Sequence, residues 1–253
     1  MAKKEERIQA LLSYIRTYEY VPITQLMDEF QVSKSTIVRD LAQMDQDGLI
    51  ERIHGGARAL TNDRLTKFHI REKMNEEAKA KIVKEAAKQI EDHDVIYLDT
   101  GSTCFMLYQE ITAKDITVFT PNLAIVNAET NPNISHIYVL EGELSKTSYS
   151  LGGNLTIENM QRIYPDKIFF SALGLNNRQR HEIRCATEIQ MSTYKTICKM
   201  EGEKIMLMDS SKIGLREAFR GNSIKDIDML ITDNNIKDKD AKSLAEDVNL
   251  IVC

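Results

Sequence analysis

Residues 32–41 read Val-Ser-Lys-Ser-Thr-Ile-Val-Arg-Asp-Leu, and residues 51–57 read Glu-Arg-Ile-His-Gly-Gly-Ala. In the first stretch, Ile37 and Leu41 recur at helical spacing with Met44, so we expect a helix that buries these three side chains. Ser33 stands just before this helix and is a suitable N-cap. Gly48 is expected to end the helix, and residues 49–57 can form a short hairpin that presents a small wing.

Two apolar patterns that precede this stretch predict two more helices. One helix is expected from about residue 4 to 18, and a shorter one begins just after Pro22. Their apolar positions, spaced i, i+3, i+4 and i+7, are Ile8, Leu11, Leu12 and Ile15, then Ile23, Leu26, Met27 and Phe30. Three short helices can bury these faces only against one another, which predicts a helix-turn-helix arrangement.

The outer face of the third helix carries polar residues suited to DNA. In helix-turn-helix proteins the first turns of the second motif helix reach base edges. Short hydroxyl side chains permit a close approach, and an arginine can bind a guanine or a phosphate. The candidate DNA-binding residues of the helix and the wing are Ser33, Lys34, Ser35, Thr36, Arg39, Arg52, His54, Gly55 and Gly56.

The charge of this part of the chain does not by itself indicate a nucleic-acid partner. Residues 1–58 contain eight Lys and Arg residues and nine Asp and Glu residues, a net charge of −1. A strongly basic footprint is therefore absent, so either the acids face elsewhere or binding depends on the geometry of a dimer. The pattern alone also fits a three-helix packing module with a solvated polar face, or a domain that contacts other proteins.

The run Thr-Ile-Val-Arg-Asp-Leu at 36–41, with Arg-Ile-His-Gly-Gly-Ala at 52–57, resembles the winged helix-turn-helix of the DeoR family of bacterial transcription regulators. The family usually has two adjacent arginines in the third helix. Here Arg39 matches the second, and Val38 replaces the first, which alters one contact to DNA. The resemblance implies double-stranded operator DNA as a partner.

Length and composition favour a globular protein of two domains. The chain has 253 residues, of which 42% are hydrophobic and 28% are charged, as in ordinary globular proteins. We expect a DNA-binding domain at 1–58, a linker at 59–73 and an α/β domain at 74–253. The absence of a long apolar run or a signal-peptide pattern argues against a membrane or secreted role and favours a cytoplasmic one. Four scattered cysteines lack metal-ligand spacing, so we expect no metal and no cofactor.

The second domain alternates strand-like and helix-like segments. Helices are expected at 75–91, 102–111, 186–200 and 238–247. Short apolar runs predict strands at 95–98, 116–120, 137–140, 167–172, 204–208, 229–232 and 250–252. Such alternation predicts a mostly parallel sheet covered by helices, and ligands of such folds bind at the C-terminal ends of the strands.

The first of these strand ends reads Asp-Thr-Gly-Ser-Thr at 99–103 and opens a helix. A glycine turn that leads into a helix N-terminus offers free N–H groups and a positive dipole end, both suited to a phosphate. Ser102 and Thr103 add hydroxyl groups. The same pattern is also common in a capped turn from strand to helix that binds nothing.

Other strand ends carry further polar groups. Thr120-Pro121-Asn122 follows the second strand, Gly142 the third, and residues 209–212 a later one. Lys212 can supply a cation for a sugar phosphate, and Asp99 or Asp209 can accept from sugar hydroxyls. Each alone also fits an ordinary polar loop, and Lys212 fits a solvated surface residue. Their shared placement favours a joint binding site.

This half resembles the effector domain of the DeoR family, whose fold is related to sugar-phosphate isomerases and CoA transferases. The resemblance implies a phosphorylated sugar as effector. The candidate effector-binding residues are Asp99, Gly101, Ser102, Thr103, Thr120, Asn122, Gly142, Gly153, Glu188, Asp209 and Lys212. The chain departs from the family at Pro121, at Glu143 and across 181–195, where Glu188 matches the family acid but the lysine that usually follows it is missing.

We therefore expect a repressor of a carbohydrate uptake or catabolic operon, released from its operator by a sugar phosphate. A homodimer or homotetramer, held through the second domain, would place two winged helices on operator half-sites. The rival interpretation is a sugar-phosphate isomerase with a fused DNA-binding domain, for which Asp99, Asp209 and Lys212 could act. A sensor gains nothing by consuming its signal, so we expect no catalytic residues.

Overall fold

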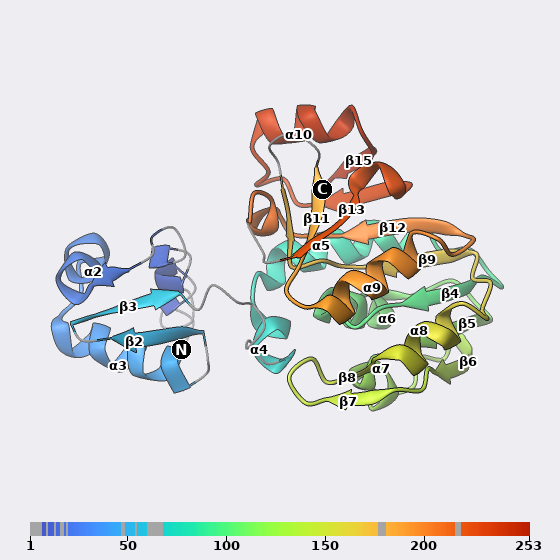
Figure 1. Ribbon diagram of the computed structural model, residues 1–253, viewed down its shortest axis with the longest axis horizontal. Coiled ribbons are helices and arrows are strands. Elements are labelled where there is room, and N and C mark those ends of the chain that lie inside the picture. Colours follow the sequence, from blue (N-terminus) through green and yellow to red (C-terminus); the bar gives the residue numbers. More distant parts are fainter. Residues whose placement is uncertain are drawn as a thin grey trace. The chain divides into compact units, whose positions relative to one another are not determined.

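The computed structural model describes the chain except for residues 1–6, 9, 13, 16–17, 19, 47–48, 54, 60–67, 177–180 and 216–218. The chain divides into two compact units, residues 1–74 and 75–253 (Figure 1). Gly48, expected to end the third helix, His54, expected in the wing, and most of the expected linker lie outside the described residues.

The N-terminal unit is a helix-turn-helix with a small antiparallel sheet. The described residues between 7 and 15 are helical. They are followed by β1 (Val21–Pro22), α2 (Ile23–Phe30), α3 (Lys34–Gln46), β2 (Ile50–Ile53) and β3 (Gly56–Ala59). The strands pair in the order β1-β3-β2, with β2 and β3 forming the predicted hairpin. The predicted helix-turn-helix is therefore confirmed.

The core of this unit is built from the predicted apolar stripes. Leu11, Ile15, Leu26, Ile37 and Leu41 are all fully buried in one cluster. The start of α3 is also as expected, because the Thr36 N–H donates to Ser33 Oγ at 3.3 Å. A serine oxygen that accepts from the N3 amide is the usual N-cap contact. The helix is thereby fixed at its first turn, next to its exposed polar face.

The stretch expected as a linker holds a helix in its described part. α4 (Phe68–Lys73) begins at the buried Phe68. Ile70 and Met74 pack against the core of the N-terminal unit. Apolar residues spaced at helical intervals explain the difference, because a solvated linker would leave them exposed.

The C-terminal unit is built on a seven-stranded parallel sheet with the order β15-β14-β12-β9-β4-β5-β6. Every predicted strand is present, although β6 starts earlier than expected. The strands are β4 (Val95–Leu98), β5 (Ile116–Thr120), β6 (Ile134–Val139), β9 (Lys167–Phe170), β12 (Glu203–Leu207), β14 (Met229–Thr232) and β15 (Asn249–Val252).

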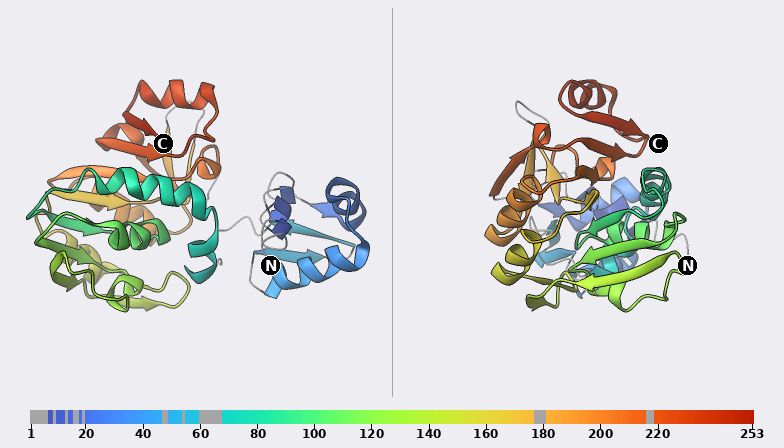
Figure 2. Two further views of the ribbon diagram at one scale, coloured as in Figure 1. Left: turned by 180° about the vertical axis from the view of Figure 1, so that it is seen from behind. Right: turned by 90° about the vertical axis from the view of Figure 1, so that its right-hand side faces the viewer.

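Helices cover both faces of this sheet, as parallel sheets require. α5 (Glu76–Ala87) and α6 (Ser102–Glu110) pack on one face. α8 (Asn154–Met160), α9 (Glu188–Ile197) and α10 (Asp238–Ala245) contribute to the core on the other face. The front and back views show these two layers on opposite sides of the sheet (Figures 1 and 2). Alternate strand residues enter the two cores, which confirms the predicted α/β class.

Two small antiparallel sheets and several short elements complete the unit. β7 (Glu143–Ser145) pairs with β8 (Ser150–Gly152), and β10 (Gly174–Leu175), β11 (Glu182–Cys185) and β13 (Phe219–Ser223) form a second small sheet. The short elements are α7 (Leu123–Val126), η2 (Ser210–Lys212) and η3 (Ile224–Asp226). Across the described residues, no helix combines the length and the apolar character needed to span a membrane.

Candidate functional site

The outer face of α3 is exposed and polar, as the sequence predicts. Ser33, Lys34, Ser35 and Arg39 are exposed, and Thr36 is half-buried. The hydroxyl of Ser33 lies 2.9 Å from those of Ser35 and Thr36, so the three form a small hydrogen-bonded group. This face offers one guanidinium, one ammonium and several hydroxyls to a partner.

Acidic residues near this face are held in ion pairs. Asp40, next to Arg39 in sequence, is buried and accepts from Arg7 Nε at 2.7 Å. On the hairpin, Glu51 pairs with Arg58 at 2.6 Å. Each pair neutralises one acid and one cation, so Asp40 and Glu51 do not add unpaired negative charge beside the α3 face, while the net charge of −1 is unchanged.

The wing has an exposed arginine and an exposed glycine at predicted positions, and a buried glycine at another. Arg52 is exposed on β2, and Gly55 is exposed in the turn with φ of 81°, a backbone conformation that favours glycine. Gly56 is buried, and a Cβ there would lie 2.4 Å from the Tyr20 ring. Gly56 therefore makes room for Tyr20, and its expected role in letting a DNA groove approach the backbone stays a prediction.

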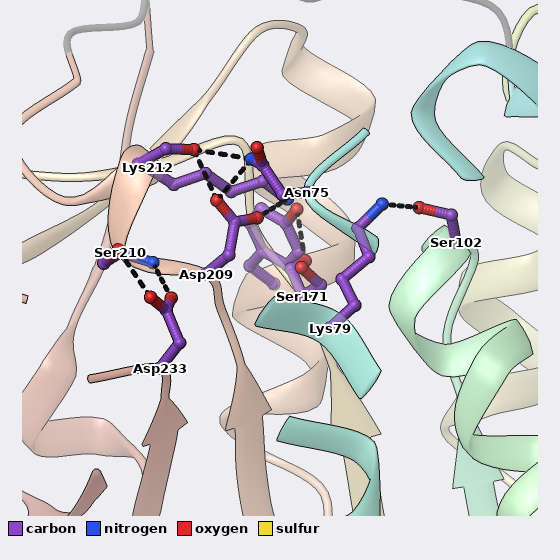
Figure 3. Close-up of polar contacts among 10 residues, drawn as sticks. Asn75, Lys79, Ser102, Ser171, Asp209, Ser210, Lys212 and Asp233 are labelled. Carbon is purple, nitrogen blue, oxygen red and sulfur yellow. Dashed lines mark hydrogen bonds and ion pairs between the residues drawn. The ribbon is translucent and has the colours of Figure 1, made fainter. Parts of the chain in front are cut away.

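In the C-terminal unit, polar side chains gather at the ends of β4, β9 and β12 and at the start of α5 (Figure 3). We call this group the strand-end cluster. It consists of Asn75, Lys79, Ser102, Ser171, Asp209 and Lys212. Because β9 lies between β4 and β12 in the sheet, the loops that follow the three strands are neighbours.

Lys79 is a buried lysine whose ammonium lies at the start of α6. Its side chain is 3% exposed, and Nζ lies 3.1 Å from Ser102 Oγ. Gly101 is the N-cap of α6 and gives no side-chain cap to the first amides. A buried ammonium and a helix N-terminus both favour an anion at the same place.

Asn75 and Lys212 meet at Asp209. Asn75 Nδ2 donates to Asp209 Oδ1 at 2.9 Å and to Ser211 Oγ at 3.0 Å, and Ser211 Oγ also bonds to Asp209. The Lys212 ammonium lies 3.8 Å from Asp209 Oδ2, which is buried and accepts no hydrogen bond from the described residues. Asn75 and Lys79 are four residues apart on one side of α5, so the first turn of α5 joins the loops after β4 and β12.

Asp99 and Lys212 both act electrostatically on Cys104, which lies in the first turn of α6. Burial raises the pKa of the Cys104 thiol, the negative charge of Asp99 raises it further, and the positive charge of Lys212 lowers it. Asp99 also accepts from Tyr97 Oη at 3.1 Å, and burial followed by the Asp99 charge holds the Tyr97 pKa well above its ordinary value. Thr103 is buried in the same turn.

Asp233, at the end of β14, positions the loop that carries Asp209. It accepts from the backbone N–H of Ser210 at 2.6 Å and from the Ser210 hydroxyl at 2.9 Å. Burial opposes ionisation, but hydrogen bonds from Ser210 and Asn235 outweigh it and lower the Asp233 pKa. The ionised carboxylate therefore anchors this loop.

Two predicted effector residues brace the site instead of facing it. Thr120 is fully buried and donates to the Leu98 carbonyl at 2.6 Å. Asn122 is also fully buried, and its amide donates to the carbonyls of Asp99 and Gly101 at 3.3 Å. Its side-chain oxygen caps α7. Since these polar groups are bonded within the protein, their contribution is to hold the 99–101 turn.

The remaining predicted residues lie apart from the contacts of the cluster. Gly142 packs closely, because a Cβ there would lie 2.2 Å from Thr156 Oγ1 and 2.5 Å from the Gly152 carbonyl. Gly153 has φ of 99° and precedes α8. Glu188 is the first residue of α9 and makes no hydrogen bond or ion pair with the cluster in the described part of the chain.

Sequence analysis missed Asn75, Lys79 and Ser171. Lys79 had a detectable signal, because it lies on the same apolar helix face as Ile82 and Ala86, where a lysine is unusual. Asn75 lies 134 positions from Asp209, and no local pattern joins them. Ser171 follows β9, and its hydroxyl is buried without a partner among the described residues.

Two family models match this chain and together span most of it. The model described as the DeoR-like helix-turn-helix domain matches residues 7–63, and the DeoR C terminal sensor domain matches residues 74–234. The chain belongs to the DeoR family. The suspected resemblance is therefore confirmed for both units, and DeoR proteins are transcription regulators.

Curated relatives of this DeoR protein span almost its whole length. The lactose phosphotransferase system repressor of Streptococcus mutans is 28% identical over 94% of this chain and 95% of its own length. The transcriptional repressor GlcR of Bacillus subtilis is 29% identical, covering 91% and 88%. The regulator GolR of Listeria innocua is 30% identical, covering 91% of each.

Among solved structures, a D-ribose-5-phosphate isomerase in complex with phospho-erythronic acid shares 21% identity, with a TM-score of 0.38 over 55% of this chain and 54% of its own.

Within the DeoR chain, Pro121, which departs from the family pattern, fits into the local hydrogen bonding. Its carbonyl accepts from the Leu151 N–H at 2.8 Å, and Asn122 still reaches the turn that precedes α6.

Proposed function

We propose that this DeoR protein represses a carbohydrate uptake or catabolic operon and is released from DNA by a phosphorylated sugar bound at the strand-end cluster. The observation that carries the proposal is the buried Lys79 ammonium at the open N-terminus of α6. Relatives named as repressors of sugar systems support the same assignment. The protein would act in the cytoplasm, where bacterial DNA lies.

The phosphoryl group would bind between Lys79 and the first turn of α6. A dianion there accepts from the ammonium, from the hydroxyl of Ser102 and from backbone N–H groups. The glycine at position 101 leaves space, since a Cβ there would lie 3.3 Å from the Ser171 Cβ. Sequence analysis assigned this role to the same turn, and we propose Lys79 as the cation.

The sugar hydroxyls would bind on the Asp209 side of the cluster. Asp209 Oδ2 and the hydroxyls of Ser171 and Thr232 are buried polar atoms without hydrogen-bond partners in the described part of the chain. Such atoms cost free energy unless a ligand or a water satisfies them. They end three adjacent strands, so one polyhydroxylated ligand could serve all three.

Asn75 gives a route from the ligand to the N-terminal unit. It is the first residue of the C-terminal unit, has φ of 52°, and bonds to Asp209. A sugar hydroxyl that donates to Asp209 would compete with the Asn75 amide. The start of α5 would then shift at the point where the chain enters the N-terminal unit, and operator affinity would fall.

DNA binding would require at least two copies. The exposed cations of the α3 face and wing are few, because Lys34, Arg39 and Arg52 are the predicted ones that the structure describes. Two copies on neighbouring half-sites double the phosphate contacts and add base contacts at helical-turn spacing. We therefore propose a homodimer or homotetramer as the active repressor.

The test is to select bound fragments from genomic DNA, then to measure operator binding with pentose and hexose phosphates and with the matching free sugars. We expect one sugar phosphate, and not its free sugar, to weaken operator binding by about 5-fold to 150-fold. The same ligand at one hundred times its Kd should stabilise the protein by about 2.7 kcal/mol in thermal unfolding.

The same samples separate the sensor from the rival isomerase. We propose that the ligand is returned unchanged, so its aldose and ketose forms should stay constant over hours beside the protein. Turnover that disappears in Asp209→Asn would favour the isomerase. Operator binding that no sugar phosphate changes would contradict the proposed sensor.

A further inference from the structure

β6 is an edge strand that is exposed on both of its faces. Along Ile134–Val139 every side chain from Ser135 to Val139 is exposed, and Tyr138 is 52% exposed. Parallel strands normally have both faces covered. The six residues include no proline, lysine or arginine, the residues that usually protect an edge from pairing. This end of the sheet therefore lacks a covering element in the described chain.

The backbone of β6 has one side available for another strand. Leu140 N–H donates to the Thr120 carbonyl of β5 at 3.0 Å. Because backbone direction alternates along a strand, Tyr138 and His136 also direct their N–H and C=O groups to β5. Ser135 lies at an irregularity in the β5–β6 register. Ile137 and Val139 direct their N–H and C=O groups outward, where the sheet order of the described residues has no further strand.

Exposed apolar side chains concentrate around this edge. Val126 on α7, Leu144 on β7 and Leu155 on α8 are each 41–53% exposed, in addition to Ile137, Tyr138 and Val139 on β6. Figure 1 shows β6, α7, β7 and α8 gathered at one end of the sheet. At the opposite edge, on β15, the one large apolar side chain that is exposed is Val252. Concentrations of this kind mark interaction surfaces.

We propose that β6 pairs in antiparallel fashion with β6 of a second copy of this chain, which joins two seven-stranded sheets. An outward-facing residue at the centre of the strand can lie on a two-fold axis, so Ile137 would pair with Ile137 of the second copy. His136 then lies opposite Tyr138, within the part of β6 whose register is regular. Tyr138 already stacks on Phe119 with ring centroids 4.8 Å apart, which fixes its ring for the second copy.

The charge of the strand does not oppose pairing with a second copy of itself. β6 contains no acidic, lysine or arginine residue, so the pairing brings no like charges together within it. Stable interfaces bury about 1,600 Å² in total, more than one strand pair supplies. The exposed Val126 and Leu144 beside the edge would therefore join the interface. A two-fold contact also closes after two copies, which avoids open-ended association.

The inference rests on the proposal that the repressor is a homo-oligomer, and it identifies β6 as the surface through which two copies bind. Its test is the mass of the full-length protein by light scattering, for the wild type, Ile137→Lys and Val252→Lys. Val252→Lys is the matched control, since it places a lysine at an exposed valine on the other edge strand. We expect Val252→Lys to keep the wild-type mass of two or more chains, and Ile137→Lys to halve that mass.

A second variant tests how the two β6 strands are aligned, and it disturbs the fold less than Ile137→Lys does. Ile137→Cys should form a disulfide between copies under mild oxidation, because residues paired in this way have Cα atoms about 5.5 Å apart. Tyr138→Cys should not, because its neighbour across the axis is position 136. A wild type of one chain, a folded Ile137→Lys that keeps the wild-type mass, or equal cross-linking of both cysteine variants would overturn the inference.

Stabilisation of each variant by sugar phosphate keeps this test separate from the proposed function. The strand-end cluster lies on α5, α6 and the loops after β9 and β12, away from β6 in the sheet order. Ile137→Lys should therefore still be stabilised by the ligand that stabilises the wild type. If ligand binding fails in the wild type and the mass pattern holds, the sensor proposal fails and the interface stands.

Discussion

The α3 face and the strand-end cluster are both polar, but one is exposed on a single helix and the other is buried among several elements. On α3, Lys34 and Arg39 project from a helix whose other side is fully buried. In the cluster, Lys79 and Asp209 are almost wholly buried and bond to residues distant in sequence. Substitutions on the exposed face of α3 should therefore change binding alone, whereas those in the cluster should also change stability.

The largest expected effect is on ligand binding when the buried cation is removed. Lys79→Met keeps the length of the side chain and loses the ammonium beside Ser102. A charge-assisted hydrogen bond contributes about 1.5–3 kcal/mol, so affinity for the sugar phosphate should fall about 10-fold to 150-fold. Calorimetric titration measures the loss.

Lys84→Met is the matched control, because Lys84 lies on the same helix and is exposed. It should leave ligand affinity within about twofold of the wild type. If Lys79→Met binds the sugar phosphate as tightly as the wild type and stays folded, the phosphoryl group does not bind at Lys79.

On the α3 face the expected effect falls on DNA alone. Arg39→Ala should weaken operator binding by about 1–3 kcal/mol, the usual contribution of a base contact, with no change in thermal unfolding. Anisotropy titrations at several salt concentrations measure it, and a smaller salt slope would assign Arg39 to a phosphate. Arg39→Lys keeps the charge and tests whether the paired N–H donors of the guanidinium are needed for binding. Unchanged operator affinity in both variants would remove Arg39 from the interface.

How far the sequence predicts each region follows from the same contrast. Periodicity locates the exposed face of α3, and apolar runs locate all seven strands of the main sheet. The sequence pattern cannot show that Thr120 and Asn122 donate to the backbone carbonyls of Leu98 and Asp99, which lead into the turn before α6. Nor can it tell that Gly56 is covered by Tyr20. Pairs such as Asn75 and Asp209 arise only when topology brings α5 to the end of β12.

A smaller effect is expected where α3 is held in place. Asp40→Ala leaves Arg7 free to turn toward solvent, since that side chain is already 25% exposed. We expect a loss of about 1–2 kcal/mol in the free energy of unfolding, less than for a fully buried pair. Urea unfolding measures it, with Glu29→Ala, an exposed acid on α2, as control. Equal stability of both variants would show that the ion pair does not hold α3.

The smallest effect is the pH dependence contributed by Asp233. Its pKa is lowered in the folded protein, so its ionised form stabilises the fold above the unfolded pKa of about 3.9, and that stabilisation is lost as pH falls through the folded pKa. Asp233→Asn should therefore be less stable than the wild type at pH 7 by about 1 kcal/mol. Urea unfolding at pH 7, 5, 4 and 3 should show this difference shrinking below pH 4. A difference that stays constant to pH 3 would mean that the Asp233 charge does not anchor the loop carrying Asp209, and that the shape of the side chain alone holds it.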